Sequence, residues 1–150
     1  MKSGPERELI ARYLDRAIAT GKSLGLAGFT VHELQESRAA SAPARKAEEG
    51  QRLHDLLSGY RRLVVLDEHG RNLGSADFAA YIDKLRASST ENLAFVIGGA
   101  DGLDPALIDR ADLVLSFSAL TWPHQIVRIL LAEQLYRMTT ILTGHPYHRQ

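Results

Sequence analysis

Three of the six histidines stand on either side of the last long apolar segment, with His124 before it and His145 and His148 after it. A histidine side chain titrates near neutral pH, so each of the three can accept or release a proton in a reaction. One histidine alone is more often structural than catalytic. Three in the two blocks that flank one predicted helix favour a role in proton transfer.

The chain ends with a short set of chemically versatile side chains, His145-Pro146-Tyr147-His148-Arg149. Tyr147 offers a ring that can stack on a nucleobase, and Arg149 offers a cation that can bind phosphate. The alternative interpretation is a polar, frayed chain end. The histidines have neither H-E-x-x-H spacing nor convergent carboxylates, so the sequence predicts no metal site.

A glycine-rich stretch is the second candidate for chemistry. The apolar run 93–97 predicts a strand buried on both faces, and Gly98, Gly99, Asp101 and Gly102 follow it. Glycines let the backbone turn and approach a ligand closely, and open α/β sheets bind ligands at the carboxyl ends of their strands. The alternative is a tight strand–helix turn without a ligand. The spacing is not the dinucleotide fingerprint G-x-G-x-x-G.

Alternating strands and helices must position these residues. Apolar runs predict strands over residues 63–66, 93–97 and 113–117, with a short further candidate over 29–34. Helical spacing and capping residues predict helices over residues 5–21, 41–57, 75–85, 105–111 and 124–142, and a loop over 70–74. Four residues are the expected N-caps: Ser3, in a capping box, Ser41, Ser75 and Asp104. The charged segment 45–52 is interpreted as a solvated face. This alternation indicates an α/β domain with a mainly parallel sheet and helices on both faces.

The last predicted helix is apolar over more than one face. A helix that packs on one sheet needs a single apolar stripe, so the excess predicts a homodimer in which Leu131 and Leu135 are interface positions. Glu133 and Arg137 are spaced for an i,i+4 ion pair. The apolar or long side chains of the helix are Ile126, Val127, Ile129, Leu130, Leu131, Gln134, Leu135, Met138, Ile141 and Leu142.

Composition narrows the class of protein. The 150 residues carry zero formal net charge, with 18 basic and 18 acidic side chains. Indiscriminate nucleic-acid binding depends on phosphate neutralisation, so this balance argues against it and leaves only a local basic patch. The absence of cysteine excludes disulfides and thiolate sites and fits a reducing compartment. With no membrane-spanning run and no secretion signal, we expect a single cytoplasmic domain over residues 1–150.

Four blocks of the sequence resemble one family in the same order: residues 95–102 (FVIGGADG), 115–125 (LSFSALTWPHQ), 128–137 (RILLAEQLYR) and 145–149 (HPYHR). The chain is similar, over nearly its whole length, to the ribosomal large-subunit RNA methyltransferase H family of the SPOUT superfamily. The resemblance implies a homodimeric enzyme with an α/β fold and a C-terminal trefoil knot. It also implies S-adenosylmethionine as cofactor and N3 of a pseudouridine in large-subunit (23S) ribosomal RNA, free or in the ribosome, as target.

The resemblance also implies roles for individual residues. His124, His145 and His148 become candidates for removing the N3 proton, and the tail is expected to complete the partner subunit's active site. Apolar walls are expected from Leu66, Leu120 and Trp122. The alternative for Trp122-Pro123 is a rigid turn before a helix. The implied cofactor residues are Leu66, Gly98, Gly99, Phe117, Ser118, Ala119, Leu120, Thr121 and Trp122. The implied RNA-binding residues are Arg128, Arg137, Tyr147 and Arg149.

One feature departs from the family pattern. Family members begin with a strand and a glycine-containing loop, whereas here the first helix is predicted from Pro5, which we interpret as a late-assigned start or a shortened chain. A missing strand leaves the backbone hydrogen-bonding groups of one sheet edge unpaired, which should weaken the fold. The loops expected to bind the ligand lie elsewhere, so we expect the ligand pocket still to be recognisable. The rival class is a non-catalytic ribosome- or RNA-binding protein, or an inactive shortened form of the same fold. A third interpretation is a nucleotide-dependent enzyme on an unknotted sheet.

Overall fold

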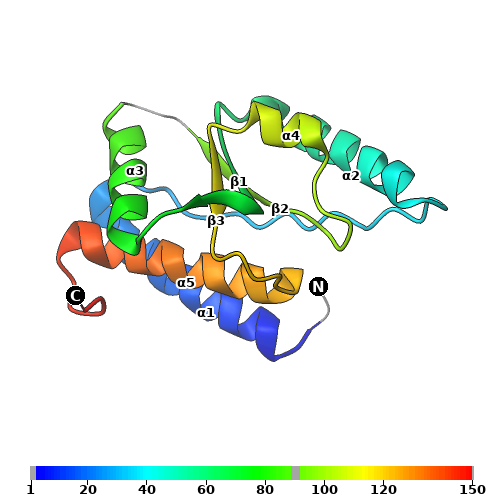
Figure 1. Ribbon diagram of the computed structural model, residues 1–150. Helices are drawn as coiled ribbons and strands as arrows, with labels where there is room; N and C mark the ends of the chain where they lie inside the picture. The colour runs from blue at the N-terminus through cyan, green and yellow to red at the C-terminus, as the bar shows by residue number, and fades with distance from the viewer. Residues whose placement is uncertain (1–2, 89–91, 150) are drawn as a thin grey trace. The chain divides into compact units, whose positions relative to one another are not determined.

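The computed structural model describes residues 3–88 and 92–149, and the chain divides into two compact units (Figure 1). One unit takes its described residues from 1–32, 73–88 and 125–150 and is helical. The other takes them from 33–72 and 89–124 and contains the sheet. Within the described residues, no helix is both long and apolar enough to cross a membrane.

The helical unit consists of α1 (Pro5–Gly21), a short 3-10 turn η1 (Lys22–Leu24), α3 (Ser75–Ala87) and α5 (His124–Thr143). The rings of Tyr13 on α1 and Tyr136 on α5 lie 6.4 Å apart, and the hydroxyl of Ser75 donates a 2.8 Å hydrogen bond to Gln134 on α5. Both α1 and α3 therefore contact α5, which is the longest helix and ends next to the C-terminal tail.

The sheet unit has three strands, β1 (Arg62–Asn72), β2 (Leu93–Ile97) and β3 (Leu113–Ser116), in the order β2-β1-β3. Both pairings are parallel, which confirms the three main predicted strands and their parallel arrangement. The helices of this unit are α2 (Ala42–Leu56), the 3-10 turn η2 (Leu57–Gly59) and α4 (Pro105–Arg110). All five predicted helices are present with ends within a few residues of those expected.

The strand at the centre of the sheet is β1, not β2. Residues 63–66 of β1 are all buried, whereas in β2 only Val96 is, with 4% of its surface exposed. The prediction that 93–97 is buried on both faces is therefore wrong. In the described sheet β1 has a neighbour on each side, whereas β2 has one only on one side. The other edge strand, β3, is nevertheless buried at three of its four residues, so the edge position alone does not account for the difference.

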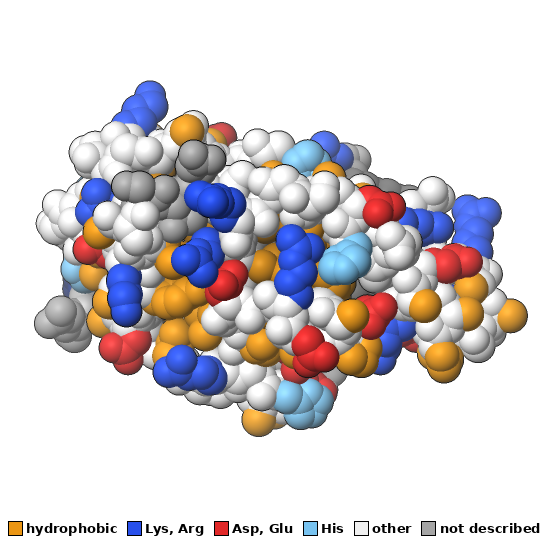
Figure 2. All heavy atoms as spheres, turned by 90° about the horizontal axis from the view of Figure 1, so that it is seen from above, with side chains coloured by type: hydrophobic (Ala, Val, Ile, Leu, Met, Phe, Trp, Pro, Cys, Tyr) orange, Lys and Arg blue, Asp and Glu red, His pale blue; other side chains and the backbone are white. Residues whose placement is uncertain are grey.

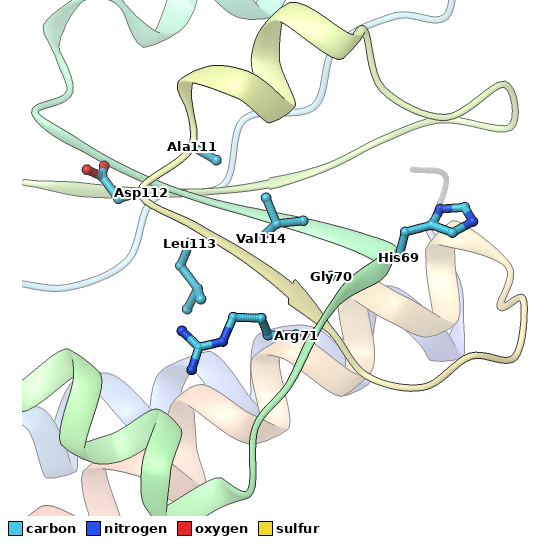
Figure 3. A pocket seen from close by; sticks show the side chains of 7 residues that line it. All are labelled: His69, Gly70, Arg71, Ala111, Asp112, Leu113 and Val114. Carbon is cyan, nitrogen blue, oxygen red and sulfur yellow. The ribbon is translucent and has the colours of Figure 1, made fainter.

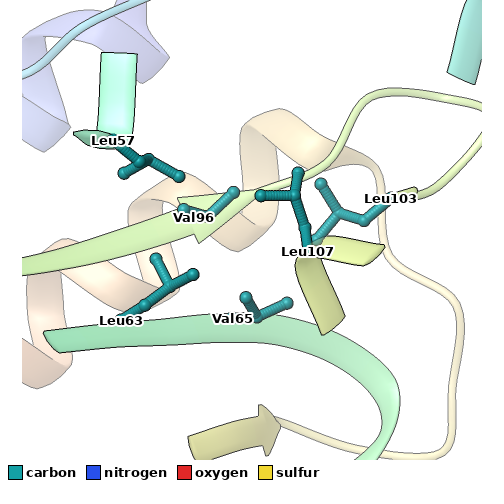
Figure 4. Packing of buried hydrophobic residues seen from close by; sticks show 6 residues of the cluster. All are labelled: Leu57, Leu63, Val65, Val96, Leu103 and Leu107. Atoms are coloured by element: carbon teal, nitrogen blue, oxygen red, sulfur yellow. The ribbon is translucent and has the colours of Figure 1, made fainter. Parts of the chain in front are cut away.

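The core of the sheet unit lies between the sheet and α2, η2 and α4 (Figure 4). Alternate residues of β1 point to this face, as a strand period of two requires. Each large aliphatic side chain buried in this way stabilises the fold by about 1.5–3 kcal/mol. The buried members of the cluster are Leu57, Leu63, Val65, Val96, Leu103 and Leu107.

Side-chain capping explains where two of the helices begin. The Ser41 hydroxyl accepts a hydrogen bond from Ala44 N–H (3.2 Å), and the Asp104 carboxylate accepts one from Ala106 N–H (3.0 Å). Such caps satisfy backbone donors that have no partner inside the helix. Two other predicted caps are wrong: the N-caps of α1 and α3 are Gly4 and Gly74, and neither makes a side-chain cap.

Two predicted segments differ in the structure. Residues 29–34 form no strand, and Val31 is 64% exposed, because none of the three strands pairs with them and an isolated strand is unstable. Residues 70–72, expected in a loop, belong to β1. That strand bulges over 67–70, because Leu66 and Arg71 both pair with Leu115 of β3.

Candidate functional site

The register of the sheet brings three predicted cofactor segments to one edge. Leu66 pairs with Ile97 of β2 on one side and with Leu115 of β3 on the other. All strands are parallel, so Gly98 and Phe117 follow their strands at the same carboxyl edge. This edge is where open α/β sheets bind ligands.

The loop after β2 is shaped by its glycines. Gly102 has φ +85° and its N–H donates a 3.0 Å hydrogen bond to the Gly99 carbonyl, which closes a tight turn. Gly98 does not have a positive φ. A Cβ on Gly98 would lie 2.8 Å from Leu103 Cγ, too close for normal packing. A larger residue at position 98 would therefore require Leu103 to shift, independently of any ligand.

An ion pair between distant parts of the chain holds this loop to α2. Arg45 Nε donates to Asp101 Oδ2 (2.8 Å), and Arg45 Nη2 donates to Asp101 Oδ1 (3.2 Å). The hydrogen bond raises the pKa of Arg45 and lowers the pKa of Asp101. The interpretation of 45–52 as only a solvated face is thus wrong for Arg45. The sequence carries no local signal for this pair, because the two residues are 56 positions apart.

The bulge of β1 holds the second loop, residues 117–122. The Ser116 hydroxyl lies within hydrogen-bond distance of the Glu68 carbonyl (3.1 Å) and the Ser118 carbonyl (2.9 Å). The Thr121 hydroxyl donates to the Glu68 carboxylate at 3.0 Å. Glu68 therefore fixes both ends of this loop. The sequence analysis did not identify Glu68, since the bulge that presents it arises only from strand pairing.

Two apolar side chains of this loop face solvent. Leu120 is 66% exposed and Trp122 is 40% exposed. The Ser118 hydroxyl oxygen accepts from Leu120 N–H (2.8 Å) and from the Trp122 indole N–H (3.2 Å), so the loop is ordered although its apolar groups are uncovered. An ordered, exposed apolar surface at a strand end is suited to cover a flat, partly apolar ligand such as an adenosine group.

A cavity of about 360 Å³ lies on the same unit, between the bulge of β1 and the start of β3 (Figure 3). Its lining includes Arg71, whose side chain lies beside Leu113 in the close view. None of the predicted cofactor residues lines this cavity. It therefore does not coincide with the predicted ligand edge.

The C-terminal tail folds back on α5. The Tyr147 hydroxyl donates to Glu133 Oε1 (3.0 Å). The centroid of the Tyr147 ring lies 4.4 Å from the centroid of the Tyr136 ring and 5.2 Å from the Arg137 guanidinium. Burial, followed by the Glu133 hydrogen bond, raises the pKa of Tyr147 to about 12. Because these contacts order it, the tail over 145–149 is not a frayed end.

The three candidate histidines lie at two separate places. His124 is the first residue of α5, whereas His145 and His148 follow its last residue, Thr143. A helix of 20 residues is about 30 Å long. The structure therefore brings His145 and His148 together at one end of α5 and leaves His124 at the other.

The candidate RNA-binding arginines have different surroundings. Arg137 forms the predicted ion pair with Glu133 at 2.5 Å. Arg128 is half-buried on α5, and Arg149 is exposed in the tail. Figure 2 shows a face of the molecule on which basic side chains are interspersed with acidic and hydrophobic ones, in keeping with the zero net charge.

The predicted interface residues of α5 are already covered. Leu131 and Leu135 are 8% and 5% exposed within the single chain, so they cannot offer a surface to a partner, contrary to expectation. A different strip of the helix surface is less covered, because Ile126, Leu130 and Ile141 share it and are only half-buried.

Comparison with known proteins assigns the family. A family model described as "Predicted SPOUT methyltransferase" matches residues 1–148. This chain belongs to that family. Three relatives are each named ribosomal RNA large subunit methyltransferase H. The Brucella abortus protein is 55% identical over 158 residues, covering 99% of this chain and 94% of its own. The Brucella anthropi protein is 56% identical over 149 residues, covering 99% and 93%. The Brucella melitensis protein is 53% identical over 163 residues, covering 99% and 94%.

Membership of the SPOUT methyltransferase family requires a site for a methyl donor. At the edge formed by Leu66, Gly98 and loop 117–122, exposed apolar side chains lie beside backbone groups at strand ends, a combination common in small-molecule sites. Among residues 3–88 and 92–149, no group of three or more His, Asp or Glu side chains is arranged to hold a metal ion.

Proposed function

We propose that this chain is an S-adenosylmethionine-dependent methyltransferase that modifies N3 of a pseudouridine in large-subunit (23S) ribosomal RNA. The observation that carries the proposal is the pairing of Leu66 with both Ile97 and Leu115, which aligns two loops at one carboxyl edge of a parallel sheet. The relatives' names supply the RNA substrate class. The modified atom comes from the family resemblance of the sequence.

The cofactor site combines backbone and apolar groups. In this proposal, the backbone of Gly98 and Gly99 and of residues 117–122 hydrogen-bonds the adenine edge and the amino-acid part of the cofactor. Leu66, Leu120 and Trp122 contribute the apolar walls. The exposed state of Leu120 and Trp122 supports this assignment, since a bound ligand would remove their surface from water.

The chemistry places few demands on the protein. S-adenosylmethionine supplies the activated methyl group and the leaving group when it is bound. The side chains of this enzyme must hold the RNA base in line and remove one proton, and a histidine is suited to that task. We assign RNA binding to Arg128, Arg149, Tyr147 and, through its ion-pair network, Arg137. With zero net charge, affinity for RNA depends on these few side chains, which lie along α5 and after its end, and on the shape of the RNA.

The site is completed, in this proposal, by the tail of a second subunit. Loop 117–122 leads directly into α5, and the tail follows its other end, so a helix about 30 Å long stands between them. Two subunits that pack antiparallel along α5 would bring the tail of one to the loop of the other. The half-buried side of α5 with Ile126, Leu130 and Ile141 supports such a self-complementary interface.

We further propose the remaining family features for this chain: a C-terminal trefoil knot, helices on both faces of the sheet, a single domain and action in the cytoplasm. The similarity of 53% to 56% along nearly the whole chain supports them. A knotted chain is expected to refold slowly after complete denaturation, because a terminus must pass through a loop.

The decisive experiment incubates the purified chain with methyl-labelled S-adenosylmethionine and ribosomal substrates. Free 23S RNA, large subunits and assembled ribosomes are compared, and the methylated nucleoside is identified by mass spectrometry. Ribosomes that lack the pseudouridine are the matched control. Label in N3-methylpseudouridine, absent from the control, is the expected result. Ribosome binding without methyl transfer would instead support the non-catalytic alternative.

A further inference from the structure

We infer that Thr140 fixes His148 in the tautomer that carries its proton on Nδ1, which leaves Nε2 free to accept the N3 proton. Thr140 is then a positioning residue and His148 the proton acceptor. The inference rests on the proposed function for its catalytic part, whereas the tautomer is a property of the folded chain alone.

The argument begins with the single proton of the Thr140 hydroxyl. Its Oγ1 lies 2.7 Å from the Arg137 carbonyl, one turn earlier in α5, and a carbonyl can only accept. The hydroxyl proton is therefore used in that bond. The side chain is fully buried, with 0% exposure, so no water competes for it.

The contact with His148 then has one direction. His148 Nδ1 lies 3.3 Å from the same Oγ1. An oxygen whose only proton is already donated can interact with this nitrogen only as an acceptor, so His148 Nδ1 must carry the hydrogen. In the neutral ring the other nitrogen, Nε2, is then without a proton and acts as a base.

His145 is held in the opposite tautomer. The Tyr147 backbone N–H donates to His145 Nδ1 at 3.1 Å, so this nitrogen must be unprotonated. A neutral His145 then carries its proton on Nε2 and cannot accept another there. The two tail histidines, three residues apart, thus differ in chemistry, and only His148 offers a free Nε2.

The tail contacts keep this arrangement in place. Tyr147 is anchored to Glu133 on α5 by its hydroxyl, and it lies between the two histidines in sequence. A tail fixed at Tyr147 and Thr140 presents the His148 ring with little freedom to rotate. A base held in one tautomer and one orientation transfers a proton more efficiently than a mobile one.

The proposed step balances in protons and electrons. The pseudouridine N3–H proton passes to Nε2 of His148, and the N3 electron pair forms the new bond to the methyl carbon. The electron pair of the broken carbon–sulfur bond remains on sulfur, which loses its positive charge. His148, now an imidazolium, returns its proton to water after the product leaves.

The test uses three substitutions in α5. Thr140→Val removes the hydroxyl at nearly constant shape, and Thr140→Ser retains it. Thr143→Val is the matched control, because the Thr143 hydroxyl makes the same kind of bond, to the Thr139 carbonyl at 2.7 Å, without a histidine partner. For each full-length chain, the His148 and His145 tautomers are read from ring ¹⁵N NMR shifts. Cofactor affinity and the single-turnover methyl-transfer rate are measured in parallel.

We expect His148 in the Nδ1–H form and His145 in the Nε2–H form in the unchanged chain. Thr140→Val should shift His148 towards Nε2–H and slow methyl transfer by about 10-fold, with unchanged cofactor affinity, as for other residues that orient a functional histidine. Thr140→Ser and Thr143→Val should retain both properties. His148→Asn should slow transfer by about 10²–10⁴-fold, and His145→Asn by less.

Either of two results would overturn the inference: His148 in the Nε2–H form in the unchanged chain, or full methyl-transfer rate in a Thr140→Val chain whose tautomer has shifted. Failure of the proposed function is a separate outcome. It would appear as absence of methyl transfer by the unchanged chain, and the NMR measurement would still decide the role of Thr140.

Discussion

Arg45 and Asp101 form a two-pronged ion pair that joins the first turns of α2 to the glycine loop after β2. Arg45 also donates to the Ala39 carbonyl at 3.2 Å, so its guanidinium is held on both sides. Paired Arg–carboxylate bonds fix geometry as well as charge. This contact therefore ties the loop that contains Gly98 and Gly99 to α2.

Replacing Asp101 by Asn should weaken cofactor binding. The amide keeps the shape of the side chain but loses the charge that holds Arg45, so the loop becomes less ordered. We expect affinity for S-adenosylmethionine, measured by calorimetry, to fall on the order of tenfold. Asp83→Asn is the matched control, because it breaks an exposed pair with Arg86 on α3 and should leave affinity unchanged. Equal affinities for the two variants would show that the ion pair does not position the loop.

The Arg45–Asp101 ion pair makes the stability of the folded chain depend on pH, and the pKa of Asp101 gives the direction of this dependence. The pKa of Asp101 is lowered in the folded chain from its ordinary 3.8, chiefly by the Arg45 hydrogen bond. Its contribution to stability is therefore present above that ordinary value and is lost as the pH falls through the lowered one. Cofactor affinity in the unchanged chain should not depend on Asp101 titration near neutral pH.

Removing one exposed apolar group should affect the cofactor but not the fold. Leu120→Ala deletes a side chain that is 66% exposed, so we expect little change in melting temperature and a loss of affinity on the order of tenfold. Leu34→Ala is the control, since Leu34 is also exposed, at 37%, but lies outside the predicted site. If both variants bind the cofactor like the unchanged chain, loop 117–122 does not form an apolar wall.

Charges placed on the two sides of α5 should have different effects. Leu130→Lys adds a charge on the half-buried side and should dissociate a homodimer into folded monomers. Leu135→Lys places the charge at a buried position, 5% exposed, and should unfold the chain. Analytical ultracentrifugation and circular dichroism distinguish the results. A monomeric unchanged chain at micromolar concentration would contradict the dimer proposal.

Tyr147 should titrate later than an ordinary tyrosine. Burial and the Glu133 hydrogen bond raise its pKa from 10.0 to about 12, so the neutral form is favoured in the folded chain. The stabilisation is present below pH 10 and is lost as the pH rises from about 10 through 12. Ultraviolet absorbance of the phenolate measures this titration. Glu133→Gln should lower the pKa, and Tyr147→Phe should remove the late step, whereas Tyr60→Phe should retain it.

Mixed dimers test whether the tail acts across the interface. One subunit lacks residues 145–150, and the other carries Leu120→Asp, which should prevent cofactor binding without disturbing the buried core. Each parent dimer should be inactive. The mixed dimer should recover one working site, which joins the intact loop of the first subunit to the intact tail of the second. Absence of recovery, with all dimers shown to be folded, would mean that the tail acts within its own subunit.

Local patterns in the sequence were sufficient for the elements and for the family. Apolar runs predicted β1, β2 and β3, and Ser41 and Asp104 predicted where α2 and α4 begin. These features depend on residues close together in the chain, where periodicity and capping act. The motif blocks from residue 95 to the C-terminus identified the family, because the order of four short blocks is itself highly specific.

The relationships that define the site were decided only by the tertiary structure. β1 is central and β2 lies at an edge because of strand pairing, which the apolar content of the two runs does not reveal. Arg45 meets Asp101 across 56 positions, and Thr140 and Tyr147 set opposite tautomers for two similar histidines. Such pairings depend on which surfaces pack together, and a charged or titratable side chain looks the same in sequence whether it is solvated or held by a partner.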